Sequence, residues 1–324
     1  MIGPVTYPTT GFYQTTNPAT GQLEKNQGRY RVFYRERADQ SNPDNLTNLL
    51  KLVDGLNTNS TDGLYTTQMD ALLDTEQWMR VFALNDALDN SDSFGNSGGK
   101  NMFAYKLLGD KWRLLIWDLD VGLGEWASCL PLLPEPERNA ALFYNWDTNT
   151  VRLEGHPPFR RAWYRAVSEL LNGPMNSASL DPVLTANYAE LTNNGFNARS
   201  PFEVATNVCN TNYSYSLKSW IDARRALLSN ELTGVAVTFA ITNHAGSDFF
   251  SPVTTVLLGG TAPVDVANIR INSTTSNAPV AWATVTNWTV SVTLEHPGPN
   301  LLTVRGYDLL GASNAVDTIT ITRF

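Results

Sequence analysis

Side chains with oxygen donors gather between residues 92 and 120 of the sequence, namely Asp92, Asn101, Asp118 and Asp120. The stretch 111–117 is apolar enough to predict a buried strand that ends at the carboxylate pair. Since side chains alternate along a strand, Asp118 and Asp120 would then share one face. Two such carboxylates repel each other unless a cation, an arginine or a shared proton relieves them. A hard cation such as Mg²⁺, which binds carboxylates and phosphates together, is the simplest relief, and this indicates phosphoryl-transfer chemistry.

The elements that must position these residues can be read from apolar spacing and turn signals. Helical spacing follows Asn42-Pro43, and a second helix follows Asp74, which is a good N-cap. Turn residues fill 90–99, and two short strands at 102–108 and 112–117, joined by Gly109-Asp110, predict a hairpin. Further helices are expected at 157–171, 180–192 and 214–231, and a strand at 29–34.

The spacing changes from helical to alternating at about residue 233. The alternating segments that follow are short and separated by Gly, Pro and Asn turns, which is typical of an antiparallel β-sandwich. This part lacks a Cys…Trp…Cys framework, so any immunoglobulin likeness is one of architecture. The sequence therefore predicts a domain boundary near residue 232.

Composition excludes some classes of protein. The chain has 324 residues and a net charge of −8, which argues against a nucleic-acid partner because no basic patch is present to displace counterions. No apolar run approaches the ~20 residues of a membrane span, and the N-terminus does not resemble a signal peptide. Cys129 and Cys209 match no metal-ligand spacing and are either buried free thiols or one bridge.

One set of motifs resembles a known family. It consists of Asp74-x-x-x-Trp78, Asn90-x-Asp92-Ser93, Lys100-Asn101-x-Phe103-x-Tyr105, Trp117-Asp118-Leu-Asp120 and, more loosely, Trp220-Ile-x-x-Arg224. Together these motifs resemble the CotH family, bacterial spore-coat H-type proteins whose catalytic domain is similar to a divergent protein kinase. The resemblance is dense over residues 70–125 and looser to about residue 231.

The resemblance implies a role for each site residue. Asp92 would be the catalytic base that accepts the hydroxyl proton of a Ser or Thr. Asn101 and Asp118 would hold Mg²⁺ or Mn²⁺ against the phosphates of ATP, and Asp120 would support the same ion. The implied reaction is transfer of the ATP γ-phosphate to a secreted or surface protein of a bacterium, which would place the chain outside the cell or on its surface.

The resemblance also implies an α+β architecture in three parts. Residues 1–40 would be a remnant or linker of a truncated N-terminal lobe. Residues 41–231 would form a mostly helical, kinase-like C-lobe with a small hairpin carrying the metal site, and residues 232–324 an immunoglobulin-like β-sandwich. Kinases grip the nucleotide with a lysine in a small lobe, whereas residues 1–40 offer only Lys25 in a turn-like context. We therefore expect a fragment or a degenerate member, in which ATP binding stays open.

Alternatives remain at this point. The kinase-like part could be catalytically inactive, a pseudokinase in a surface or adhesion module whose β-sandwich contacts a surface protein or a polysaccharide. A glycoside hydrolase with two carboxylates is a third interpretation, although carboxyls two residues apart suit a shared metal better. An arginine such as Arg80 or Arg113 could relieve Asp118 and Asp120 instead, and Asp92 could simply close an Asx-turn.

Overall fold

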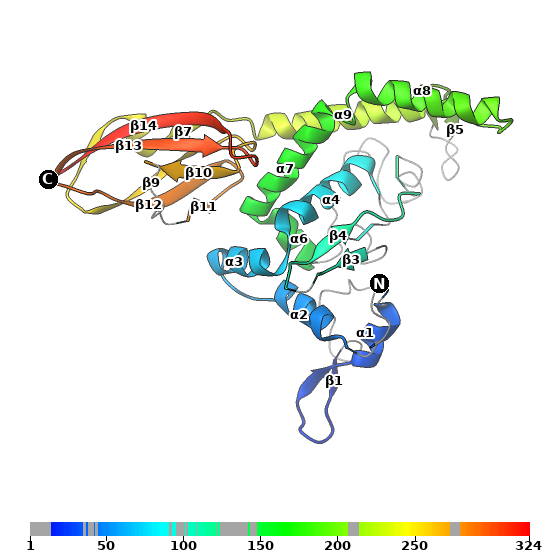
Figure 1. The fold of residues 1–324 in the computed structure, drawn as a ribbon, viewed down its shortest axis with the longest axis horizontal. Coiled ribbons are helices and arrows are strands. Elements are labelled where there is room, and N and C mark those ends of the chain that lie inside the picture. Colours follow the sequence, from blue (N-terminus) through cyan, green and yellow to red (C-terminus); the bar gives the residue numbers. More distant parts are fainter. Residues whose placement is uncertain are drawn as a thin grey trace. The chain divides into compact units, whose positions relative to one another are not determined.

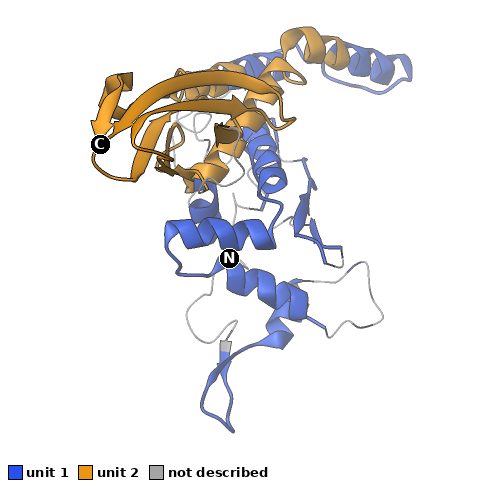
Figure 2. Cartoon of the chain, turned by 60° about the vertical axis from the view of Figure 1, so that its left-hand side comes forward, with its two compact units in different colours: residues 1–155, 185–224 blue, residues 156–184, 225–324 orange. Residues whose placement is uncertain are grey.

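The computed structural model describes residues 14–34, 37, 42, 45–90, 93–94, 101, 103–107, 109–120, 122–123, 142, 148–206, 214–272 and 279–324. The chain divides into two compact units (Figure 2), a first unit of Met1–Gly155 with Thr185–Arg224 and a second of His156–Leu184 with Arg225–Phe324. Helices dominate the earlier part of the chain and strands the later part (Figure 1), which confirms the predicted α+β class. No helix among the described residues is long and apolar enough to cross a bilayer.

The N-terminal part of the first unit contains a hairpin and a helix. Strands β1 (Gln14–Thr16) and β2 (Leu23–Lys25) pair antiparallel, and α1 (Gln27–Phe33) follows. The strand predicted at 29–34 is therefore wrong. The Asn26 side chain caps α1 by accepting from the Arg29 N–H, and Tyr30 stacks on Tyr34 one helical turn later, at 6.1 Å between ring centroids.

Three helices follow: α2 (Thr47–Leu56), α3 (Asp62–Leu72) and α4 (Thr75–Leu88). The sequence predicted α2 and α4 but not α3. Asp74 is the N-cap of α4, since its side chain accepts from the Gln77 N–H, and this confirms the predicted start of the helix. The buried face of α4 carries Trp78 and Phe82, whose rings meet edge to face at 6.1 Å. This aromatic packing holds α4 rigidly inside the first unit.

The later helices are α6 (Thr148–Gly155), α7 (Pro157–Asn172), α8 (Ser177–Asn193) and α9 (Leu217–Gly234), with a short hairpin of β5 (Ala205–Thr206) and β6 (Ser214–Tyr215) before α9. The helices predicted at 157–171, 180–192 and 214–231 are confirmed with shifted ends. Two prolines open α7, where their missing N–H groups cost no helical bond. Ser216 accepts from the Ser219 N–H at 3.0 Å, so α9 begins later than predicted.

Two four-stranded sheets make up the strand-rich part of the second unit. One has the order β10-β13-β14-β8 and the other β11-β12-β9-β7. The strands are β7 (Ala240–Ile241), β8 (Phe249–Ser251), β9 (Thr255–Thr261), β10 (Asn268–Ile271), β11 (Ala281–Trp282), β12 (Asn287–Thr293), β13 (Gly298–Tyr307) and β14 (Ser313–Arg323). All pairs are antiparallel except β8 with β14.

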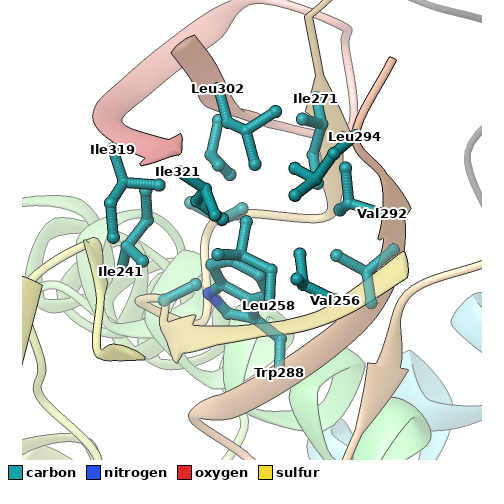
Figure 3. Packing of buried hydrophobic residues seen from close by; sticks show 14 residues of the cluster. Ile241, Val256, Leu258, Ile271, Trp288, Val292, Leu294, Leu302, Ile319 and Ile321 are labelled. Atoms are coloured by element: carbon teal, nitrogen blue, oxygen red, sulfur yellow. The ribbon is translucent and has the colours of Figure 1, made fainter. Parts of the chain in front are cut away.

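The two sheets share one apolar core (Figure 3), in which Leu258 and Trp288 of one sheet lie with Leu302 and Ile321 of the other. Alternation along β12 buries every second residue, as the sequence pattern predicts. The β-sandwich prediction therefore matches two sheets around a common core. Its likeness to an immunoglobulin domain stays a prediction.

Helix α7 belongs to this second unit, and one buried arginine binds it to the strand-rich part. The Arg161 guanidinium donates to four carbonyls, those of Pro263 (2.6 Å), Val266 (2.6 Å), Ala262 (3.2 Å) and Val285. Its Cζ also lies 3.5 Å from the centroid of the Trp282 ring. Burial lowers the pKa of Arg161 to about 9, so the group still carries its proton at neutral pH. The domain limits 1–40, 41–231 and 232–324 stay a prediction, and the last of them would separate α7 from the strands that it contacts.

Candidate active site

The hairpin that precedes the carboxylates is present but shorter than predicted. Strand β3 (Phe103–Tyr105) pairs antiparallel with β4 (Arg113–Leu115), with Phe103 opposite Leu115. The predicted strand reached Trp117 and was expected to be buried. That prediction is wrong, because Trp117 is 53% exposed, although it contacts Phe103 at 4.6 Å between ring centroids.

Helix α4 and the residues just before it hold the hairpin by side-chain and backbone bonds that take the place of a third strand. The Gln77 amide donates to the Leu114 carbonyl at 2.6 Å and accepts from the Leu114 N–H at 2.9 Å. The Trp112 carbonyl accepts from the Asp74 N–H at 3.0 Å and from the Trp78 indole N–H at 2.9 Å. The backbone groups at the free edge of β4 therefore find their hydrogen-bond partners on a helix instead of on another strand. These bonds fix β4 where it leads toward Asp118.

Arg113 does not relieve the carboxylate pair. Its guanidinium binds Asp74 at 3.0 Å and Asp110 at 2.5 Å. The hydrogen bond from Arg113, followed by one from the Lys111 N–H, lowers the pKa of the Asp110 carboxyl. Arg113 thus joins Asp110, in the turn of the hairpin, to Asp74 at the start of α4, and both ion pairs stabilise the hairpin.

Asp118 and Asp120 do not lie on a strand. Strand β4 ends at Leu115, Asp118 has a left-handed φ of 58°, and the chain then turns so that the Gly122 N–H donates to the Leu119 carbonyl at 3.2 Å. The argument that strand alternation places both carboxylates on one face is therefore wrong. Both residues are exposed, so burial does not force a cation to bind there.

The segment that follows Asp118 is nevertheless tied to the end of α4. The Asn90 side-chain amide donates to the Asp118 carbonyl at 3.2 Å, and the Leu123 N–H donates to the Leu88 carbonyl at 2.7 Å. Asn90 and the Asp118 turn, far apart in sequence, therefore meet through a side-chain-to-backbone hydrogen bond. Asp92 itself lies outside the described residues, as do Cys129 and Cys209.

The donor atoms of the predicted ligands fit a hard cation in their chemistry. Asp118 and Asp120 supply carboxylate oxygens and Asn101 an amide oxygen, the set that Mg²⁺ and Mn²⁺ prefer. Asn101 is partly buried and has a left-handed φ of 52°, like that of Asp118. Within the described parts of the chain, no three or more His, Cys, Asp and Glu side chains gather around a common point.

Lys25 is a residue whose position the sequence interpretation missed. It ends strand β2 instead of lying in a turn, and its Nζ binds the Asp54 carboxylate of α2 at 2.8 Å. The turn lies earlier, where the Gly21 N–H donates to the Asn17 carbonyl at 2.8 Å. The stretch from Asn17 to Gly21 carries the turn residues Asn, Pro and Gly, and that signal could have revealed the hairpin.

Comparison with known proteins identifies the family. The family model described as "CotH kinase protein" matches residues 8–228, a region that includes Lys25, Asp92, Asn101, Asp118 and Asp120. No curated protein and no solved structure matches the chain. The family match covers more than half of the sequence and supports the resemblance seen in the motifs. The chain belongs to the CotH kinase protein family.

Proposed function

We propose that this chain is a CotH-like protein kinase that transfers the γ-phosphate of ATP to Ser or Thr of a secreted or surface protein. The observation that carries the proposal is the bond from the Asn90 side chain to the Asp118 carbonyl. It joins the Asn-x-Asp segment, which would supply the base, to the turn that would supply the metal ligand. Kinase chemistry needs these two groups side by side, since phosphoryl transfer depends mainly on positioning and charge neutralisation.

Each residue then has one task. Asp92 accepts the proton of the attacking hydroxyl as the new O–P bond forms and the bond from the γ-phosphorus to the bridging oxygen of ADP breaks. Asp118, Asn101 and Asp120 are the ligands proposed for Mg²⁺ or Mn²⁺. The bound cation supplies positive charge that offsets the charge on the phosphates. The oxygen donors and the exposure of Asp118 and Asp120 support this assignment.

Lys25 is the residue that we propose for the nucleotide phosphates. Protein kinases place this lysine on a strand and pair it with a carboxylate on a helix. The ion pair from Lys25 on β2 to Asp54 on α2 has that form. Placement outside the cell or on its surface, and contact of the β-sandwich with a surface protein or a polysaccharide, remain part of the proposal and rest on the resemblance to the family.

Transfer of radiolabel from γ-labelled ATP to a Ser/Thr peptide library, with Mn²⁺ or Mg²⁺ present, tests the proposal. Asp92→Asn and Asp118→Asn should each reduce the initial rate by about 100-fold or more, because one removes the base and the other a charged ligand. Asp62→Asn is the matched control: the residue is exposed in the first turn of α3, and the substitution removes the same charge within the same unit.

Two results would overturn the proposal. One is no transfer by the unsubstituted chain under any of these conditions, which would favour the inactive surface or adhesion module. The other is an Asp118→Asn rate equal to that of Asp62→Asn. A lowered rate in both variants would indicate a general charge effect instead of a site.

A further inference from the structure

The end of helix α4 is unusual because side chains and backbone from two distant segments complete it. A helix leaves its last carbonyls without partners inside the helix. Here the Asn85 carbonyl accepts from the Asn90 N–H at 2.9 Å, and the Leu88 carbonyl accepts from the Leu123 N–H at 2.7 Å. The guanidinium of Arg224 in α9 donates to the two carbonyls between them, those of Asp86 and Ala87. Every carbonyl from 85 to 88 therefore has a donor.

Arg224 is suited to this position by charge as well as by shape. It is 2% exposed, and its Cζ lies 6.0 Å from the centroid of the Trp220 ring one turn earlier in α9. A cation at the C-terminal end of a helix is favoured by the helix dipole. The guanidinium offers several N–H groups in a fixed plane, so one side chain can serve two successive carbonyls. Arg224 therefore fixes α4 at the residues that lead into the Asn90 motif.

Asn90 continues this arrangement toward Asp118. It is fully buried, and its amide nitrogen lies 3.2 Å from the Asp118 carbonyl and 3.4 Å from Asn85 Oδ1. Asp118 has a left-handed φ, and this conformation costs free energy for residues other than glycine. It persists only where the surrounding structure holds the backbone in place. A Cβ on Gly122 would lie 3.3 Å from both the Leu88 and the Leu119 carbonyl oxygens, so the turn after Asp118 approaches α4 very closely.

We propose that Asn90 and Arg224 are positioning residues for Asp118. They act through the end of α4: Arg224 fixes its last turn, and Asn90 holds the Asp118 carbonyl, so together they set the backbone conformation from which the Asp118 carboxylate reaches a cation. This inference rests on the proposed function, in which Asp118 is a metal ligand. It assigns a role to two motif residues that the proposed chemistry leaves without one.

Binding of Mn²⁺ to the full chain, measured by electron paramagnetic resonance without nucleotide, tests the inference. Groups that orient a ligand typically change metal affinity by about 10- to 100-fold when they are removed. We expect Asn90→Ala to weaken Mn²⁺ binding by about 10-fold or more. Arg224→Lys, which keeps the charge but not the planar fork, should lose less affinity than Arg224→Met.

A matched variant separates positioning from general loss of stability. Leu56→Ala removes a buried side chain of α2 in the same unit, away from the end of α4, and should lower the melting temperature without changing Mn²⁺ affinity. If Asn90→Ala does not fold, Asn90→Asp keeps the shape of the side chain while its carboxylate cannot donate to the Asp118 carbonyl. The same loss of affinity is expected from it.

The outcomes distinguish this inference from the function on which it rests. If the unsubstituted chain binds Mn²⁺ and Asp118→Asn weakens that binding, the metal site stands. Asn90 variants with unchanged affinity would then overturn the positioning role alone. If Asp118→Asn leaves Mn²⁺ binding unchanged, the metal assignment fails. Equal losses in Asn90→Ala and Leu56→Ala would also overturn the inference, because they would trace the effect to stability.

Discussion

The Asp118 region of the first unit and the β-sandwich of the second are held in different ways. In the sandwich, long strand ladders enclose an apolar core, with Leu258 and Val304 completely buried. Around Asp118 the strands are short, Ile116 and Trp117 are about half exposed, and single side-chain bonds to α4 fix the backbone. Packing thus sets the sandwich, while a few directional polar bonds set the candidate site.

The two regions nevertheless share one device, a buried arginine that donates to backbone carbonyls. Arg161 binds carbonyls of the segments 262–266 and 285 in the second unit, and Arg224 binds carbonyls of α4 in the first. Planar guanidinium groups suit this use because their N–H groups leave in fixed directions. The difference lies in what is fixed: Arg161 joins a helix to loops between strands, whereas Arg224 completes the helix end that leads to the proposed catalytic segment.

The largest effect on stability is expected from Arg161→Met. The substitution leaves several buried carbonyls without a donor and removes the cation above the Trp282 ring. We expect the free energy of unfolding to fall by about 3–5 kcal/mol, as when one partner of a buried polar network is removed. Urea unfolding followed by circular dichroism measures the change.

Arg270→Met is the control for this substitution. Arg270 is exposed on β10 and lies 4.9 Å from the centroid of the Tyr307 ring, so its loss should cost no more than about 1 kcal/mol. Equal losses in the two variants would show that the carbonyl contacts of Arg161 contribute little. Apolar packing alone, without polar bonds from an arginine, would then account for the stability of the second unit.

A smaller effect is expected from Gln77→Ala, which removes both bonds from α4 to the Leu114 backbone. Since a partly buried N–H and carbonyl lose their partner, we expect a loss of about 1–3 kcal/mol. Hydrogen exchange of the Leu114 amide should accelerate more than that of amides in the sandwich. Glu76→Gln, a substitution on the same helix that weakens the ion pair with Arg80 at 3.5 Å and keeps Gln77, should leave that exchange rate unchanged. An unaltered Leu114 amide in Gln77→Ala would contradict the third-strand role.

Helices, the hairpin and the sandwich could be predicted from the sequence because each depends on local periodicity. Apolar spacing in α2 and the Asp74 cap gave correct helices, and alternation along β12 gave a correct strand. The strand predicted at 29–34 failed because Tyr30 and Tyr34 stack at helical spacing, a preference that the β-prone composition of the segment hid. The periodicity of apolar residues therefore predicts a helix or strand correctly where local preferences alone determine that element.

The arrangement of the candidate site could be predicted only in part. Residue types and motifs predicted Asp118 and Asn101 as ligands, but they gave no sign of the left-handed φ of Asp118 or of the bond to its carbonyl from the distant Asn90. The burial of Arg161 does not follow from its helical spacing: it is 1% exposed because loops more than a hundred residues later supply its acceptors. Contacts of this range leave no periodic trace in the sequence.

The smallest effect at neutral pH is expected from Tyr65→Phe in α3. Burial raises the pKa of Tyr65 to about 12, against the opposing charge of Arg152, whose Cζ lies 3.8 Å from the centroid of the ring. The folded state therefore keeps the phenol proton at pH values where the unfolded chain, with a pKa near 10, has lost it. This contribution to stability is complete below pH 10 and is lost as the pH rises toward 12, by about 1 kcal/mol at pH 11. The free energy of unfolding should accordingly fall less steeply from pH 9 to 11 in Tyr65→Phe than in the unsubstituted chain.

The control is Tyr105→Phe, which removes an exposed tyrosine. If stability fell with pH in the same way in the two variants, burial of Tyr65 would not govern the alkaline stability of the first unit.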